Sequence, residues 1–363
     1  MCQYSSENGG PTDWHLVHLG KFATGGAGII FCEETAIQAM GRKTYGCAGI
    51  YDNQFLPAYR RITDFLRGQG AVPAIQLGHA GRRASSKPPW TNFSPLNDAD
   101  AAKGAPPWST VSASAVPSRV GASTPVALSS AEIRGIVAAW REAAERSLEA
   151  GFDICEIHGA HGYLIHQFLS PLANRRTDSY GGDLANRMRF ALEVATAVRG
   201  VWPREKPVFF RLSAVDGDSG MWTMDDTVSL AKALKAIGID VITCSSGGIA
   251  GAPNMAIIPR TPGYQVGFAA QVRQEAQMMS CAVGLITEPA QAEEILQRGQ
   301  ADLVALAREF LYNPNWPVHA AKALGVPDYL DLLPREYAWW LKRRETVRQL
   351  NLDASADSAT GLS

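Results

Sequence analysis

Short apolar runs alternate with longer amphipathic segments along this chain. Seven of the runs have the length of a strand, and glycine or polar residues bound each of them. They are Gly28–Cys32, Val72–Leu77, Asp153–Ile157, Pro207–Leu212, Asp240–Cys244, Cys281–Val283 and Asp302–Leu306. Near-continuous hydrophobicity of this kind is typical of parallel strands that are covered on both faces. The pattern therefore predicts the strands of a parallel sheet.

The segments between the runs have the hydrophobic spacing of helices. Residues 130–150 carry apolar side chains every three or four positions, and Ser129 or Ser130, followed by Glu132, is a candidate N-terminal cap. Residues 225–238 and 288–299 repeat this design, and each segment ends in glycine just before the next strand. Repeated β–α units with right-handed crossovers predict either a doubly wound sheet or a closed barrel.

Two features favour the barrel. No G-x-G-x-x-G follows the first strand, so the fingerprint of a dinucleotide-binding sheet is missing. Residues suited to catalysis or ligand binding instead recur after many different strands. A barrel gathers all of these strand ends around one mouth. These positions are Glu33, Glu34, Gln76, His79, His158, His161, Arg211, Ser245, Ser246, Gly284, Ala307 and Arg308. We therefore predict an α/β protein with the (β/α)8 TIM-barrel fold.

The barrel is expected to form a single domain over residues 1–345. The stretch from Ser85 to Leu128 is rich in proline, serine and alanine, and we interpret it as a loop excursion that caps the barrel mouth. Seven strands are visible where such a barrel has eight, and nothing ahead of Met1 supplies the first. Residues 346–363 are expected to be a disordered tail.

Composition narrows the class of protein. Of the 363 residues 46% are hydrophobic and 19% charged, and the net charge of −1 offers no basic face to nucleic acid or to an anionic membrane. The sequence has neither an apolar run of the ~20 residues that span a membrane nor the pattern of a signal peptide. The six cysteines lack C-x2-C spacing, which disfavours zinc ribbons and iron–sulfur clusters and suits reduced thiols in a cytoplasmic protein.

The stretch EIHGAHGYL places His158 and His161 three residues apart, with Tyr163 two residues further and His166 beyond it. Three interpretations are open: a zinc site, an ordinary core, or a pair of donors that bind substrate. Catalytic zinc usually needs three protein ligands, and no carboxylate or thiolate stands at recognisable ligand spacing here. Two imidazole N–H groups on one carbonyl or nitro oxygen would instead stabilise negative charge that develops there.

Several stretches together closely resemble the Old Yellow Enzyme family, in its bacterial branch of NADPH dehydrogenases and xenobiotic reductases. The resemblance extends from Met1 to about Arg344. The matching stretches are MCQYS, TDWHLVH, IQLGHAGRRAS, EIHGAHGYLIHQFLSPLANRRTDSYGG with a following NR, SSGG, PGYQV, AVGLITEPAQAEEIL and LAREFLYNP. Each stretch alone is weak evidence, but chance does not place so many of them in order.

The resemblance implies an FMN-dependent enzyme that takes hydride from NADPH or NADH and reduces activated C=C bonds. Typical acceptors are enones, enals, maleimides, nitroalkenes and quinones. It assigns His158 and His161 to binding the acceptor and Tyr163 to donating the proton. A tyrosine of pKa about 10 suits this role when it is correctly placed, because the enolate it protonates is the stronger base.

The same resemblance implies the remaining site residues. Those assigned to FMN are Cys2, Gln76, Arg211, Gly284, Ala307 and Arg308. Tyr4 is expected to line the substrate pocket. Trp339 and Trp340 match a segment that some members insert into a neighbouring subunit's site, so a homodimer or homotetramer is expected. The resemblance implies no metal.

Two departures from the family pattern stand out. Family members have a further strand before the MCQYS motif, so we expect the true start to lie upstream of Met1. Glu34 also occupies a position beside the flavin that is usually small, where its carboxylate would either repel the reduced flavin or turn away to solvent. The missing strand motivates one alternative, a cofactor-poor barrel that acts as a binding protein. The histidine cluster motivates another, a zinc-dependent hydrolase.

Overall fold

The computed structural model describes residues 1–217, 221–249 and 260–360. Its centre is a seven-stranded parallel sheet whose strand order follows the chain. The strands are β1 (Ile29–Ala36), β2 (Val72–Gly78), β5 (Ile154–Gly159), β6 (Val208–Ser213), β7 (Val241–Ser245), β8 (Met279–Ala282) and β9 (Leu303–Val304). All seven predicted strands are confirmed, and together they form the curled parallel sheet of a TIM-barrel fold.

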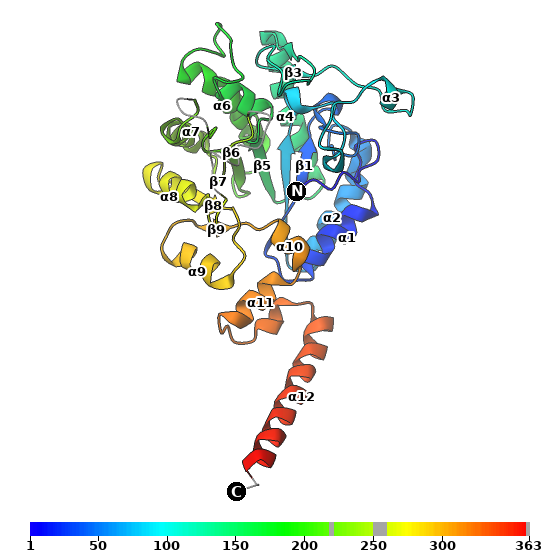
Figure 1. Ribbon diagram of the computed structural model, residues 1–363, viewed down its shortest axis with the longest axis vertical. Helices are drawn as coiled ribbons and strands as arrows, with labels where there is room; N and C mark the ends of the chain where they lie inside the picture. Colours follow the sequence, from blue (N-terminus) through cyan, green and yellow to red (C-terminus); the bar gives the residue numbers. More distant parts are fainter. Residues whose placement is uncertain (218–220, 250–259, 361–363) are drawn as a thin grey trace.

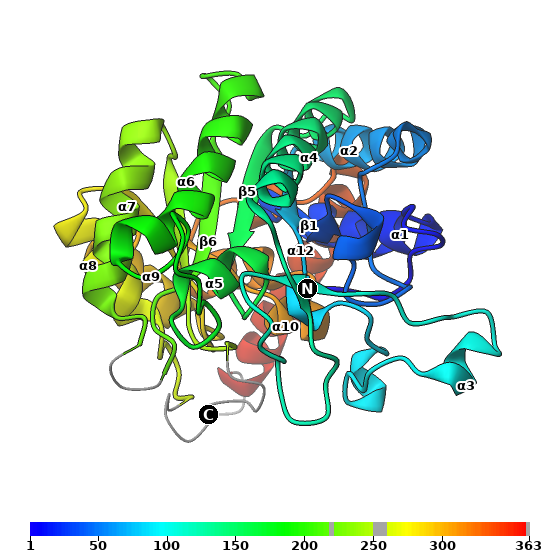
Figure 2. The ribbon, with the colours of Figure 1, turned by 90° about the horizontal axis from the view of Figure 1, so that it is seen from above.

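Helices form an arc around the outer face of this sheet, as the view from above shows (Figure 2). The longer helices of the protein are α1 (Asp13–Ala23), α2 (Leu56–Gly68), α4 (Ser130–Glu149), α6 (Leu184–Val201), α7 (Met224–Ile237), α8 (Val266–Glu275), α9 (Pro289–Gln297), α11 (Trp316–Ala323) and α12 (Arg335–Thr360), and the last of these does not belong to the arc. The shorter ones are α3 (Asp98–Ala101), α5 (Leu164–Leu169) and α10 (Arg308–Tyr312). The predicted helices at 130–150, 225–238 and 288–299 correspond to α4, α7 and α9.

The sheet separates two apolar cores. The larger core lies between the outer face of the sheet and the helices, and it includes the fully buried Trp140 of α4. A smaller core fills the inside of the curl with Ala74, Ile154, Phe209, Val241 and Cys281. Because successive residues of a strand point to opposite faces, the strands are apolar on both sides, as their sequences indicated.

The two edge strands of the sheet are β1 and β9. Within the described residues each of them pairs with one neighbouring strand, β1 with β2 and β9 with β8, and Ala36 of β1 also forms an isolated bridge with Gly49. The curl is therefore open between these two edges.

The excursion from Ser85 to Leu128 contains little regular structure. Besides α3 it contains a short 3-10 helix (Pro89–Thr91) and a two-stranded parallel ladder between β3 (Val111–Ser112) and β4 (Val126–Ala127). The rest follows loops and turns that lie beside β1 and α4 (Figure 1).

The last helix leaves the body of the protein (Figure 1). Its first turns are anchored by Ala338 and Leu341, which pack with Val318 of α11 and with Leu330 and Leu333. The backbone of α12 remains helical to Thr360, and the disorder expected for residues 346–363 stays a prediction. Residues 335–360 contain neither glycine nor proline, so nothing in them ends a helix.

The N-terminus of α4 is closed by Ser129 rather than by Ser130. The Ser129 hydroxyl accepts from the Glu132 backbone N–H at 3.3 Å, and the Glu132 carboxylate accepts from the Ser129 N–H at 2.7 Å. These are the reciprocal bonds of a capping box, which satisfy two otherwise unpaired donors.

The cap can be tested with two neighbouring serines. Ser129→Ala should lower the free energy of unfolding by about 1 kcal/mol, because it leaves a backbone donor at the helix start unpaired. Ser130→Ala, one residue along on the same exposed turn, should change it by less than about 0.5 kcal/mol. Urea unfolding followed by circular dichroism measures both, and equal effects would contradict the assignment of the cap.

Candidate active site

The inner face of the sheet becomes polar towards the carboxyl ends of its strands. Gln76 of β2 lies opposite Glu156 of β5, and His158 of β5 lies opposite Arg211 of β6, which in turn lies opposite Thr243 of β7. Residues opposite one another in a parallel ladder point to the same face, so these side chains line the inside of the curl above its apolar layer.

Glu156 holds this polar layer together. One carboxylate oxygen accepts from the Gln76 amide at 2.5 Å and the other from the Thr243 hydroxyl at 2.6 Å. Glu156 and Thr243 are both buried, so the bonds join β2, β5 and β7 through the interior. Sequence reasoning assigned no role to either residue, although a carboxylate inside the otherwise apolar run DICEI was an available signal.

Glu34 reaches the same face because β1 is irregular. The pairing with β2 shifts between Cys32 and Glu34, so Glu33 is an extra residue and Glu34 lies opposite Gln76. A β-bulge of this kind redirects the side chains that follow it. Glu33 lies next to α1, where its carboxylate accepts from the backbone N–H of Gln3 at 2.5 Å and approaches the His15 ring at 3.7 Å.

The Glu34 side chain is buried and does not turn to solvent, which settles that alternative from the sequence. Neither carboxyl oxygen has a hydrogen-bond partner among the described residues. Gly78 makes room for it, since a Cβ there would overlap one of the Glu34 oxygens. Burial, and then the charge of Glu33, raises the pKa of Glu34 to about 8. The carboxyl group is therefore mainly protonated at neutral pH.

The two predicted histidines lie together at the end of β5. Their ring centroids are 5.1 Å apart, and His158 Nε2 lies 3.4 Å from His161 Nδ1. His161 Nε2 also contacts the Ser245 hydroxyl at 2.6 Å, whereas the buried Nδ1 of His158 has no partner among the described residues. Burial lowers the pKa of both imidazoles well below the usual value, so both are neutral at pH 7.

His161 is fixed by its backbone as well as by its ring. Its φ is +58°, and its N–H donates to the Ser213 hydroxyl at 3.0 Å. Gly248 passes so close that a Cβ on it would lie 2.7 Å from the His161 Cα. The loops that follow β5 and β7 are therefore packed against each other at the histidine pair.

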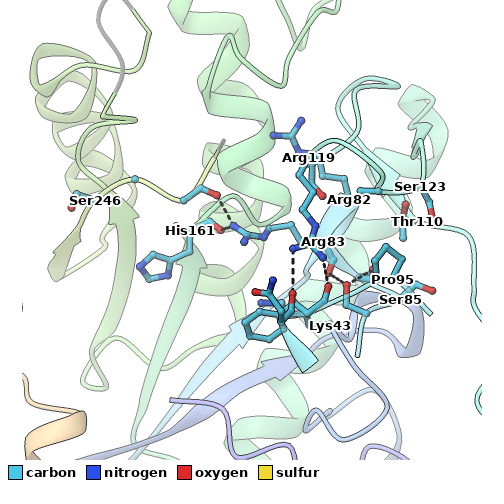
Figure 3. A pocket seen from close by; sticks show the side chains of 18 of the residues that line it. Lys43, Arg82, Arg83, Ser85, Pro95, Thr110, Arg119, Ser123, His161 and Ser246 are labelled. Carbon is cyan, nitrogen blue, oxygen red and sulfur yellow. Dashed lines mark hydrogen bonds between the residues drawn. The ribbon is translucent and has the colours of Figure 1, made fainter. Parts of the chain in front are cut away.

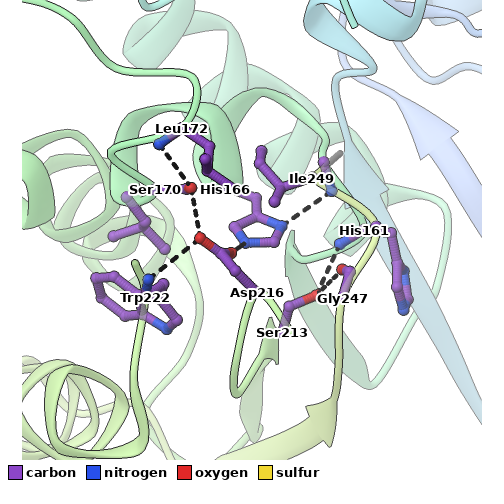
Figure 4. A network of polar contacts seen from close by, with 12 residues as sticks. His161, His166, Ser170, Leu172, Ser213, Asp216, Trp222, Gly247 and Ile249 are labelled. Atoms are coloured by element: carbon purple, nitrogen blue, oxygen red, sulfur yellow. Dashed lines mark hydrogen bonds and ion pairs between the residues drawn. The ribbon is translucent and has the colours of Figure 1, made fainter. Parts of the chain in front are cut away.

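His166 serves this loop rather than a metal. Its Nδ1 accepts from the Gly162 backbone N–H at 2.9 Å, which leaves the proton on Nε2 to be donated to Asp216 at 2.8 Å. Asp216 also accepts from Ser170 at 2.6 Å and from the Trp222 backbone at 3.2 Å (Figure 4). Among the described residues no three His, Cys, Asp or Glu side chains are arranged to hold a metal ion, so the zinc alternative lacks a third ligand.

Tyr163 directly precedes α5 and lies next to the pair. Its ring makes an edge-to-face contact with His158, with the centroids 4.9 Å apart. Burial raises its pKa well above the usual value, with Glu34 and Cys2 adding to the rise, so the phenol keeps its proton at neutral pH. The frame of His166 and Asp216 holds the turn from which Tyr163 projects.

Cys2 and Tyr4 lie near Glu33 and Glu34, whose charges contribute to raising the pKa of both groups. Burial and then the charge of Glu33 raise the pKa of the Cys2 thiol well above its usual value, so it is not a thiolate at neutral pH. Tyr4 has a φ of +56°, and its ring lies 5.8 Å from that of Trp90 and 6.1 Å from that of Phe93. These contacts connect the N-terminal segment with the excursion.

Three of the residues predicted to bind FMN, Gly284, Ala307 and Arg308, follow the last two strands. Gly284 comes two residues after β8 and Ala307 three residues after β9, and Ala282 and Val304 pair in the sheet. Gly284 has a φ of +116°, a conformation that other residues rarely adopt. Ala307 precedes the short helix α10, which begins at Arg308.

Trp339 and Trp340 lie on α12, far along the chain from these residues. Their rings are in contact, 4.5 Å apart, and 52% and 68% of their surfaces remain exposed. Neither of them is among the described residues that line the cavity beside His161. A role in a neighbouring subunit's site stays a prediction.

A cavity of about 390 Å³ adjoins His161. Of the predicted site residues that the structure describes, His161 alone lines it, and the rest of its wall comes from Lys43 after β1, the turn after β2, the excursion and the segments after β7. The inner polar face and this cavity therefore meet at the histidine pair.

Most of the predicted site residues lie towards or just after the carboxyl ends of the parallel strands, which is where enzymes with a TIM-barrel fold have their active sites. The chain belongs to the NADH:flavin oxidoreductase / NADH oxidase family, whose model matches residues 1–326. It is 44% identical to an NADPH dehydrogenase of Geobacillus sp. over 90% of this chain and 88% of the relative. A second NADPH dehydrogenase, from Bacillus cytotoxicus, is 42% identical over 90% of this chain and 87% of that protein.

A solved structure supports the same family. Morphinone reductase in complex with tetrahydroNAD superposes with a TM-score of 0.70 at 27% identity, covering 89% of this chain and 85% of that one. These relatives confirm the Old Yellow Enzyme resemblance, an oxidoreductase activity, and FMN with a nicotinamide nucleotide as cofactors.

The chemistry of the inner face fits FMN. Arg211 Nε and His158 Nδ1 are buried without a partner in the described part of the chain, and the carboxyl group of Glu34 is protonated and equally unpaired. Buried groups of this kind are costly unless a ligand satisfies them. Gln76, with its NH2 group bound by Glu156, presents an amide oxygen as an acceptor.

One further finding concerns membranes. No helix in the described residues is long and apolar enough to cross a bilayer.

The Glu34 assignment predicts a pH dependence of stability. The unfolded chain releases this proton near its ordinary pKa, whereas the folded protein keeps it to about pH 8. The folded state therefore binds more protons in between, and Glu34 lowers stability as the pH rises from about 5 to 8, by up to about 1.4 kcal/mol per unit.

Glu34→Gln removes this titration. Urea unfolding of the flavin-free protein at several pH values should show the variant gaining on the wild type as the pH rises. Glu145→Gln, on the exposed face of α4, is the control and should leave the pH profile unchanged. Parallel profiles for wild type and Glu34→Gln would mean that Glu34 is ionised in the folded protein.

Proposed function

We propose that this protein is an ene-reductase that passes electrons from NADPH or NADH to activated C=C bonds. Acceptors of this kind are enones, enals, maleimides, nitroalkenes and quinones, all of which carry an oxygen that accepts hydrogen bonds. The observation that carries the proposal is the contact between a neutral imidazole pair and a protonated tyrosine at the barrel mouth. Bound FMN would supply the two-electron chemistry that links the nucleotide to the acceptor.

In this proposal His158 and His161 bind the acceptor's oxygen. A neutral imidazole has one N–H, and the contact between His158 Nε2 and His161 Nδ1 uses one of the two protons of the pair, so both rings would donate to the substrate oxygen only after this contact is broken. His161 would exchange its contact with Ser245 for the substrate oxygen. Donors held in place in this way stabilise the negative charge that develops on that oxygen.

Tyr163 would supply the proton. The acceptor gains a hydride at its β carbon and a proton at its α carbon, and the phenolate left on Tyr163 regains its proton from solvent. The high pKa of Tyr163 keeps the proton in place until a strongly basic carbanion forms. Arg211 and Gln76 are the side chains proposed to hold the flavin ring, and Cys2 and Tyr4 would border it. Gly284, Ala307 and Arg308 are proposed for its phosphate.

The first test is spectroscopic. Protein supplied with FMN should show flavin absorbance after gel filtration, and anaerobic NADPH should bleach it. An enone such as cyclohexenone should then restore the colour with one equivalent consumed. Protein that stays colourless after incubation with FMN would contradict the proposal and favour a cofactor-poor binding barrel, the alternative motivated by the open edges of β1 and β9.

The second test separates proton transfer from the remaining steps. Tyr163→Phe should slow the reduction of an enone by about a hundredfold or more, since general-acid catalysis commonly contributes that much. Reduction of a quinone should slow far less, because its protons are added to oxygen and exchange with water. Stopped-flow reoxidation with the two acceptors gives both rates. An equal loss for both acceptors would assign Tyr163 to binding rather than to proton donation.

A further inference from the structure

The cavity beside His161 has a wall that the proposed reaction does not use. Besides His161, five segments contribute to its lining: the chain after β1, the turn after β2, the excursion, the loop after β7 and the chain ahead of α8. Its volume of about 390 Å³ lies in the range of sites that hold small organic molecules. Figure 3 shows three arginine side chains, Arg82, Arg83 and Arg119, gathered on one side of it with Lys43 nearby.

This wall is strongly cationic. The described residues that line it include Lys43, Arg82, Arg83, Arg119 and Arg260, and none of them is an aspartate or glutamate. Within the described residues none of these five side chains forms an ion pair. The chain as a whole has a net charge of −1, so the excess of positive charge is local to this cavity.

The arginines are held by backbone carbonyl groups. Arg82 donates to Ile249 at 2.8 Å and to Val116 at 3.2 Å. Arg83 donates to the carbonyls of His161, at 2.7 Å, and of Gly248, and Arg119 donates to those of Asn92 and Phe93. Carbonyl groups fix the guanidinium groups in space without neutralising them, so the charges act together on the cavity.

Lys43 adds a further positive charge to the lining of the cavity. Its Nζ lies 3.2 Å from the centre of the Phe93 ring, and 7% of its surface is exposed. Burial, and then the charge of Arg83, lowers its pKa to about 8. The cations therefore repel one another, and an anion among them would relieve that repulsion.

Two buried polar atoms in the lining also lack partners among the described residues. They are Nε of Arg82 and the hydroxyl oxygen of Thr110, on side chains that are each 5% exposed. Buried donors of this kind are usually satisfied by protein, water or ligand.

We propose that this cavity is a subsite for an oxyanion, a carboxylate or a phosphate, on the molecule whose reacting end lies at His161. The proposal rests on the proposed function, since it places that reacting end at the histidine pair. Planar guanidinium groups match the paired oxygens of carboxylates and phosphates, and fixed donors lose little entropy when they bind them. The size of the cavity suits an anionic group attached to a larger molecule.

Two molecules can bring such a group to the mouth: the acceptor, as a carboxylate, and the nucleotide donor, as the 2′-phosphate that distinguishes NADPH from NADH. The donor test compares the KM of NADPH with that of NADH, using neutral N-methylmaleimide as the acceptor. The acceptor test uses maleimidobutyrate and its methyl ester, and compares their KM values at a saturating donor concentration. In each pair the two molecules differ chiefly by one anionic group.

Arg119→Gln and Lys43→Gln should each raise, in one of the two pairs, the KM of the molecule with the additional anionic group about tenfold relative to the KM of the other molecule. The reason is that each substitution removes a charged contact to the oxyanion. Arg119→Lys keeps the charge and should recover most of the effect. Arg141→Gln removes an equal charge from the exposed face of α4 and is the control. Using ratios cancels any general loss of activity in a variant.

A changed ratio in the donor test assigns the subsite to a phosphate of the nucleotide, and a changed ratio in the acceptor test assigns it to a substrate carboxylate. Unchanged ratios in both tests, for both glutamine variants, would overturn the proposal.

Failure of the proposed function is a separate outcome. If the protein shows no NADPH-dependent turnover, calorimetric titration with inorganic pyrophosphate decides the subsite directly. Binding that weakens at least fivefold in Arg119→Gln but not in Arg141→Gln would support it. No binding to the wild type, or equal binding to both variants, would overturn it.

Discussion

The bonds from Glu156 to Gln76 and Thr243 are the constraint on which the rest of this site depends. They place a fully buried carboxylate at the centre of a parallel sheet whose deeper layer is apolar. Polar groups in such surroundings interact strongly and are costly when unpaired. The inside of the curl is therefore a rigid polar surface, and the unpaired atoms of Arg211 and His158 lie on or beside it.

Around this surface the protein uses backbone geometry to fix its reactive side chains. His161 has a left-handed backbone conformation and Gly248 packs against it, so neither loop moves without the other. His166 and Asp216 hold the turn that carries Tyr163 through bonds to the Gly162 backbone and between their own side chains. Both histidines of the pair stay neutral because burial lowers the pKa of each imidazole and the charge of Arg211 acts in the same direction, which suits hydrogen-bond donation rather than proton transfer.

The strands were predictable because parallel strands covered on both faces leave near-continuous apolar runs in the sequence. A run such as Val72–Leu77 can be recognised without knowing which strands lie beside it. The family motifs likewise located His158, His161 and Tyr163. The orientation of Glu34 was not predictable, since one extra residue in β1 decides which face the side chain joins. The cationic cavity was also hidden, because it brings together Lys43, Arg119 and the loop after β7 through contacts that no local pattern encodes.

The central claim is that the polar inner face is satisfied when FMN binds to it. Thermal unfolding of the flavin-free protein, followed by circular dichroism over a range of FMN concentrations, tests this most directly. The midpoint should rise steadily with the logarithm of the FMN concentration, and a thousandfold excess over Kd would add about 4 kcal/mol of stability. A midpoint that stays constant up to millimolar FMN would contradict the account.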